Sequence, residues 1–175
     1  CDVLVVGTDS QRVQVLGNRL SRQLQIPALF VGFHAQAATG EVIVVEPPGP
    51  CYECQAVGRF DDADPAAVGD ADLHGESSLI FDCDHVDTLV GKLVLACLLR
   101  NDLVAMKTLW DAAVRNSLIF SSQQIGATIE GVDVFRGALL DMRRTPTWHT
   151  VWFDVADSRK PNCPVCAVEH APHRL

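Results

Sequence analysis

Long apolar runs, clusters of basic residues and a glycine-rich phosphate loop are all missing from this sequence of 175 residues. No run approaches the roughly 20 apolar residues of a membrane-spanning helix, and no apolar signal segment stands at its start. Lys and Arg are scattered and the formal net charge is −8, which disfavours contacts with nucleic-acid phosphates. We therefore expect a soluble, cytoplasmic protein whose partners include neither a membrane nor a nucleic acid.

Hydrophobic residues make up 48% of the chain, enough to build one buried core. Short apolar runs at residues 28–31 and 42–45, and another at residues 3–6, predict buried strands. Residues 11–24 predict a helix, because apolar side chains recur there at helical spacing. These side chains are Val13, Leu16, Leu20 and Leu24. The alternation predicts a single α/β domain over residues 1–175 with a Rossmann-like, mostly parallel sheet.

The second half of the chain combines an acidic segment, two helices and further short strands. Residues 59–76 are rich in Asp, Gly and Ala, which predicts a solvated, mobile loop. Apolar spacing then predicts one helix that ends near Asn101 and another over residues 103–115. Further apolar runs predict a small antiparallel extension of the sheet. They lie at residues 118–120, 132–135 and 147–153.

Two cysteine pairs of the same C-x-x-C spacing lie far apart in the sequence, at Cys51 and Cys54 and at Cys163 and Cys166. Prolines flank both pairs, which favours turns. Four thiolates on two such turns are what a structural Zn²⁺ ion requires, each sulfur lying about 2.3 Å from the metal. The pattern predicts a closed four-cysteine zinc site that ties the C-terminal segment to the core.

Other uses of these cysteines are less consistent with the sequence. Disulfides require an oxidising compartment, and the seven cysteines are an odd number. A thioredoxin-like dithiol follows a strand and opens a helix, whereas the first pair here follows a proline-rich turn. His170 and His173 lie close enough to Cys166 in the sequence to offer a different ligand. Zinc is the interpretation that explains why the spacing occurs twice.

Several motifs follow one another in an order that resembles the C-terminal half of a known family. They are Val6-Gly7-Thr8-Asp9-Ser10, Asn18, Ile26-Pro27, Gly40-Glu41-Val42, Pro50-Cys51-Tyr52-Glu53-Cys54 and Arg159-Lys160-Pro161-Asn162-Cys163-Pro164-Val165-Cys166. In this order they resemble the ThiF/MoeB/HesA-type family of the ubiquitin-activating enzyme superfamily. The segment from residue 77 to residue 147 follows the family only loosely.

The resemblance implies ATP-dependent activation of a carboxyl group. Members of this family bind Mg-ATP, adenylate the C-terminus of a ubiquitin-like or sulfur-carrier protein, and are usually homodimers. Asp9 falls on the family's aspartate that organises Mg²⁺ and the triphosphate, and Asn18 is its companion as a cofactor-binding residue. A helix N-cap is the alternative role for Asp9. Ser10 stands in place of the usual Asn, and Gln14 stands where many relatives carry Arg.

The family's G-x-G-x-x-G turn and its phosphate-binding cations belong to a preceding half that this sequence lacks. We therefore expect the chain to be the C-terminal half of a longer protein and to be inactive alone. Some relatives use a catalytic cysteine in the loop before the long helix, and Cys83 is the cysteine nearest to that place. Asp82 and Asp84 flank it and disfavour a thiolate, so a structural cysteine is the alternative.

Two functions stay open on the sequence. In the first, the chain supplies the carrier-binding, zinc-bearing scaffold of a ThiF/MoeB-like adenylating enzyme. In the second, it is a non-catalytic, zinc-stapled binding or dimerisation module derived from that fold.

Overall fold

The computed structural model describes residues 1–34, 39–56, 80–116, 118–122, 128–129, 132–133, 149–154, 158–160 and 162–166. The acidic segment at residues 59–76 lies outside this part of the chain. The elements follow in the order β1 (Leu4–Gly7), α1 (Gln11–Leu24), β2 (Ala28–His34), β3 (Thr39–Val45), α2 (Tyr52–Gln55), α3 (Ile80–Leu99), α4 (Val104–Arg115), β4 (Leu118–Ser122), β5 (Thr128–Ile129), β6 (Val132–Asp133) and β7 (His149–Phe153). None of the described helices has the length and apolar character required to cross a bilayer.

The main sheet is mixed, with the strand order β1-β2-β3-β4-β7, and β5 pairs with β6 separately. Only β1 and β2 run parallel, whereas the pairs β2–β3, β3–β4 and β4–β7 are antiparallel. The α/β class is confirmed, and so is an antiparallel extension through β4 and β7. The prediction of a mostly parallel sheet is wrong for the described strands. Residues 35–38 separate β2 from β3, and a parallel crossover needs a dozen residues or more.

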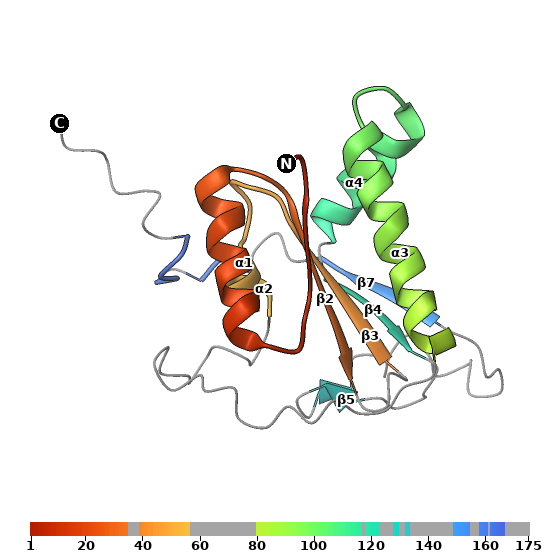
Figure 1. Cartoon of the computed structure of the whole chain (residues 1–175), viewed down its shortest axis with the longest axis horizontal. Helices are drawn as coiled ribbons and strands as arrows, with labels where there is room; N and C mark the ends of the chain where they lie inside the picture. Colours follow the sequence, from red (N-terminus) through yellow and green to blue (C-terminus); the bar gives the residue numbers. More distant parts are fainter. Residues whose placement is uncertain are drawn as a thin grey trace.

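Helices cover both faces of the sheet, with α1 and α2 on one face and α3 and α4 on the other (Figure 1). Alternate residues of β2 and β3 serve the two sides: Phe30 and Ile43 pack with Tyr52 beneath α1, and Leu29 and Val42 pack beneath α3. Because both faces are buried, these strands are continuously apolar. This explains why short apolar runs located them in the sequence.

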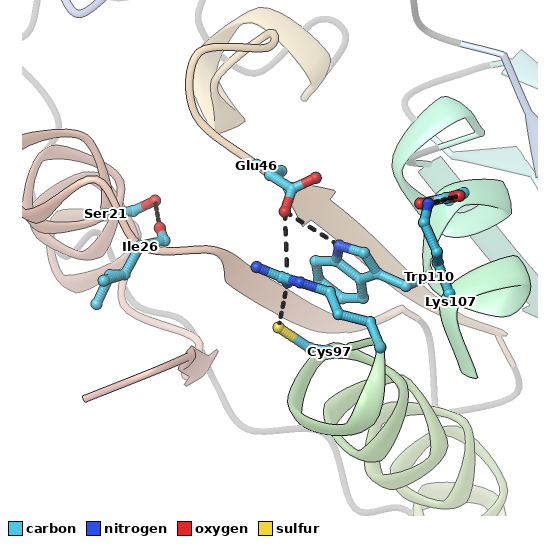
Figure 2. Close-up of polar contacts among 8 residues, drawn as sticks. Ser21, Ile26, Glu46, Cys97, Lys107 and Trp110 are labelled. Carbon is cyan, nitrogen blue, oxygen red and sulfur yellow. Dashed lines mark hydrogen bonds and ion pairs between the residues drawn. The ribbon is translucent and has the colours of Figure 1, made fainter. Parts of the chain in front are cut away.

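The predicted apolar face of α3 is confirmed in part, since Val86, Val90, Leu93 and Cys97 are buried, whereas Leu98, which belongs to the same predicted face, is 46% exposed. At its end a polar cluster joins α3, α4 and the end of β3 (Figure 2). Trp110 Nε1 donates a hydrogen bond to Glu46 Oε1 over 3.1 Å, and Arg100 Nη1 lies 3.4 Å from the same oxygen. Glu46 directly precedes the turn that leads to the first cysteine pair.

Helix α1 has the predicted bounds, but it buries its polar face and exposes its apolar face, which is the reverse of an ordinary amphipathic helix. Its apolar residues Val13, Leu16, Leu20 and Leu24 are 38–57% exposed. Its buried residues are instead Gln14, Gly17, Asn18, Ser21 and Arg22. Gln25 ends the helix in the left-handed region with φ of 55°, and Ser21 Oγ donates to Ile26 O over 2.7 Å (Figure 2). The periodicity predicted the helix but not the face that is buried.

Gly17 sets the distance between α1 and the sheet, which gives a testable prediction. A Cβ atom at Gly17 would lie 2.7 Å from Val6 Cγ2, so Gly17→Ala must displace a buried side chain. We expect this clash to outweigh the gain of about 1 kcal/mol in helix propensity and to lower the free energy of unfolding by about 1–3 kcal/mol, measured by urea denaturation. Gly91 in α3 has no atom within 4 Å of such a Cβ. Gly91→Ala is the matched control, and it should leave stability unchanged or raise it.

Candidate metal centre

The first cysteine pair is held on a short helical turn that follows β3. Gly49 N donates to Glu46 O over 2.8 Å and closes the preceding turn. Cys51 then precedes α2, and its carbonyl accepts hydrogen bonds from the N–H groups of Cys54 and Gln55 at 3.0 and 3.2 Å. This single turn places both thiols on the same side, with the Sγ atoms 3.8 Å apart.

The second pair lies on a turn of the C-terminal segment. Cys163 N donates to Lys160 O over 3.2 Å, and Cys166 N donates to Cys163 Sγ over 3.5 Å. Lys160 N also donates to Cys54 Sγ over 3.4 Å, so the backbone of this segment already contacts a sulfur of the first pair. Such N–H donors stabilise thiolate charge.

The structure brings all four predicted cysteines together, with every Sγ atom within 4.8 Å of the others. Cys51 and Cys163 lie 3.5 Å apart, and Cys54 and Cys166 lie 3.7 Å apart. A tetrahedral ion with bonds of about 2.3 Å requires sulfur separations of about 3.8 Å. All four are free thiols, and their residues are only 0–3% exposed. The cluster could therefore hold a metal ion such as zinc in a closed shell.

Arg22 places a buried positive charge against this cluster. Its Nη2 atom donates to Cys166 Sγ over 3.1 Å and also to Gly49 O, and the residue is 5% exposed. Four thiolates around a divalent ion carry two net negative charges, and burial makes uncompensated charge costly. A guanidinium group at this position offsets part of that charge and fixes the turn before the first cysteine pair.

Cys51, Cys54 and Cys166 do not share protons equally. Hydrogen bonds from Cys51 and Cys54, with a further contribution from Arg22, hold the pKa of Cys166 below its usual range. The hydrogen bond with Cys166 raises the pKa of Cys54 to about 11, and it also raises the pKa of Cys51. Among these three thiols, Cys166 is therefore the first to become a thiolate. Metal binding then releases protons from its neighbours.

A second arginine links the two cysteine segments directly. Arg159 Nη2 donates to Pro48 O and lies 3.3 Å from Gly49 O. Hydrogen bonds of Arg159 thus hold the C-terminal segment at the turn before Cys51, in addition to the contacts between the two cysteine pairs.

The first cysteine turn is also connected to the turn that carries Asp9. The Tyr52 ring stacks on Phe30 at a centroid distance of 4.2 Å, and its hydroxyl donates to Gln14 Oε1 over 2.7 Å. Gln14 Nε2 in turn donates to Thr8 O over 2.7 Å. Gln14 therefore couples the cysteine turn to the end of β1.

Asn18 lies in the same buried layer. Its Oδ1 accepts a hydrogen bond from Tyr52 N over 3.0 Å, and its Nδ2 donates to Glu53 Oε1 over 3.2 Å. The residue is 0% exposed, so both ends of its amide position the cysteine turn. Its predicted contact with a cofactor stays a prediction, while its contacts in the structure are with α2.

The two candidate catalytic residues lie outside the cysteine cluster. Asp9 is exposed just beyond β1, where a carboxylate could reach a bound cation. Ser10, not Asp9, occupies the N-cap position of α1, and it makes no side-chain capping bond. Cys83 belongs to the first turn of α3 and is half-buried. Its expected location in a loop before that helix is therefore wrong, because the helix begins earlier, at Ile80.

No family model matches the chain. No curated protein matches its sequence either.

Two similar solved structures are both of E. coli MccB. One, described as MccB with MccA-N7isoASN, is 18% identical with a TM-score of 0.42 and covers 94% of this chain. The other, of MccB, is 16% identical with a TM-score of 0.35 and also covers 94%. The chain spans only 40% and 39% of these MccB chains. At such low TM-scores the similarity establishes no shared activity.

Sequence reasoning found the four cysteines but missed the residues that support them. Gln14 and Arg22 lie on the polar face of α1. Their spacing does not mark them as buried, because the apolar residues of the helix predict burial of the opposite face. Tyr52 lies inside the first C-x-x-C pair, so its position was a usable signal.

We predict one zinc ion per chain, bound by Cys51, Cys54, Cys163 and Cys166. Cys163→Ser should abolish stoichiometric zinc and lower the melting temperature markedly, because the ion closes a long loop. Elemental analysis and calorimetry of reduced protein measure both effects. Cys83→Ser is the control and should retain zinc. A wild-type chain with clearly less than one zinc would contradict the assignment.

Arg22→Gln should weaken zinc binding about 10–100-fold, since it removes the charge that faces Cys166. The measurement is competition with a chromophoric chelator. Arg19→Gln removes an exposed charge from the same helix and should leave zinc affinity unchanged. Equal loss in both variants would show that Arg22 acts only through the general charge of the helix.

Proposed function

We propose that the chain is the zinc-bearing, carrier-binding scaffold of a ThiF/MoeB-like enzyme that adenylates the C-terminus of a ubiquitin-like or sulfur-carrier protein. The observation that carries this proposal is the connection between the buried four-cysteine cluster and the Asp9 turn, through Tyr52, Gln14 and Thr8. The closed shell gives the metal a structural role. It fixes the first cysteine turn, and the hydrogen-bonded side chains extend that order to the end of β1.

Asp9 is the residue of this chain that we assign to the reaction. An exposed carboxylate suits Mg²⁺, which prefers oxygen ligands and keeps several waters. The described residues fit only this part of an Mg-ATP site. Gln14 is buried and bonded to Thr8 and Tyr52, so it presents neither a cation nor a free amide to a triphosphate. Contacts with the phosphates must come from elsewhere in the complete enzyme.

The second candidate function is a non-catalytic, zinc-stapled binding or dimerisation module. The exposed apolar stripe of α1 favours it, because such a surface on a helix is typical of an interface. The proposed homodimer and the cytoplasmic location stay predictions. Sedimentation over a wide concentration range measures the first of these.

Because the described phosphate contacts are incomplete, we predict that this chain alone binds ATP no more tightly than about the millimolar range, or roughly −4 kcal/mol. Calorimetry with Mg-ATP measures this. Micromolar binding, or ATP–pyrophosphate exchange with a carrier ending in Gly-Gly, would show that the chain contains a complete site.

In the intact protein, the two candidate functions give different results. Asp9→Asn should reduce carrier-dependent ATP–pyrophosphate exchange at least tenfold while leaving zinc content and melting temperature unchanged, because Asp9 is exposed. Cys163→Ser should reduce exchange, zinc content and stability together. Absence of exchange in the wild-type protein with any Gly-Gly-ending carrier would favour the non-catalytic module.

A further inference from the structure

The outer face of α1, defined here as Val13, Leu16, Leu20 and Leu24, is a continuous apolar stripe exposed to solvent. The four residues are 46%, 56%, 38% and 57% exposed. From Val13 to Leu24 the stripe extends about 16 Å, or three helical turns. Covering these side chains would remove apolar surface from water, which is favourable.

The stripe is a consequence of how α1 is fixed, and it cannot be turned inward. Gly17 packs against the sheet at a distance that leaves no room for a Cβ atom, and Asn18 and Arg22 are bonded to the cysteine turns. A rotation of the helix that buried Leu16 and Leu20 would break these contacts. Within the described residues, a rotation of α1 therefore cannot bury the stripe.

Charge identifies the kind of partner that fits. Arg12 and Arg19 are exposed beside the stripe, and α1 contains no acidic residue. At 100° per residue the two arginines fall on the same flank, together with Gln23. Asp9 precedes the helix and is exposed, so the positive charge is concentrated toward Arg19. In a chain with a formal net charge of −8, this flank is unusual.

An antiparallel second copy of α1 is a poor occupant for this surface. Antiparallel pairing of two stripes would place Arg12 and Arg19 of both copies on the same flank, and like charges in contact are unfavourable. We propose that the outer face of α1 docks an amphipathic helix of a partner protein, whose leucine-like stripe is flanked by Asp or Glu. This is packing of one helix on another, with the anchors of α1 at i, i+3, i+7 and i+11.

The test uses two synthetic helical peptides with the same leucine stripe, one flanked by Glu and the other by Lys. Fluorescence anisotropy should show the Glu peptide binding at least tenfold more tightly to the wild-type chain, with the difference falling at high salt. The double variant Arg12→Glu, Arg19→Glu should reverse the preference. The double variant Leu16→Gln, Leu20→Gln should lose binding of both peptides.

Leu98→Gln is the matched control, because Leu98 lies on α3 and is 46% exposed. It should leave peptide binding unchanged, and circular dichroism and zinc content should be the same in all variants. Equal affinity for the two peptides, no saturation by either, or an equal loss in the Leu98 variant would overturn the proposal. The proposal would also be overturned if the wild-type chain formed a dimer and the Leu16→Gln, Leu20→Gln variant did not, since a second copy would then be the occupant.

Discussion

The four sulfur atoms are the constraint on which the rest of this structure depends. They join two segments that are 112 residues apart in the sequence, and joining segments so distant is entropically costly. Without a common ligand, four buried thiols would be a weak link between these segments. With a divalent ion, the same four groups become a closed shell that fixes the turn after β3 and the C-terminal segment together.

The polar contacts around the cysteines explain the reversed orientation of α1. A helix that packs only on a sheet buries its apolar stripe, but α1 also packs against the four-cysteine cluster and its turns. It does so with Arg22 against Cys166 and with Asn18 against the backbone of Tyr52. The polar face is buried because it has partners there, and the apolar stripe is left outside. The support of the four-cysteine cluster and the exposed outer face of α1 are therefore two consequences of one arrangement.

The same contacts connect the hydrophobic core and the first cysteine turn to the turn that carries Asp9. Tyr52 contacts Phe30 in the core and Gln14 on α1, and Gln14 holds the carbonyl of Thr8 beside Asp9. On the other face of the sheet, Glu46 binds Trp110 at the start of the turn that leads to Cys51. The first cysteine pair is thus supported from both helical layers. Its position depends on packing as well as on the metal.

The sequence alone determined the positions of several elements and the four cysteines that come together. Continuous apolar runs located β1, β2 and β3, helical spacing gave α1 its bounds, and the repeated C-x-x-C spacing identified the four cysteines, because each of these signals is local. Tertiary structure decided the direction of β3, the place of Cys83 within α3, and the face of α1 that is buried. The short connection after β2 sets the direction of β3, and the start of α3 at Ile80 sets the place of Cys83. The buried face of α1 depends on the contact between Arg22 and Cys166, which lies far along the chain. Local periodicity carries no information about such long-range partners, so the polar residues that support the metal centre became visible only in the folded molecule.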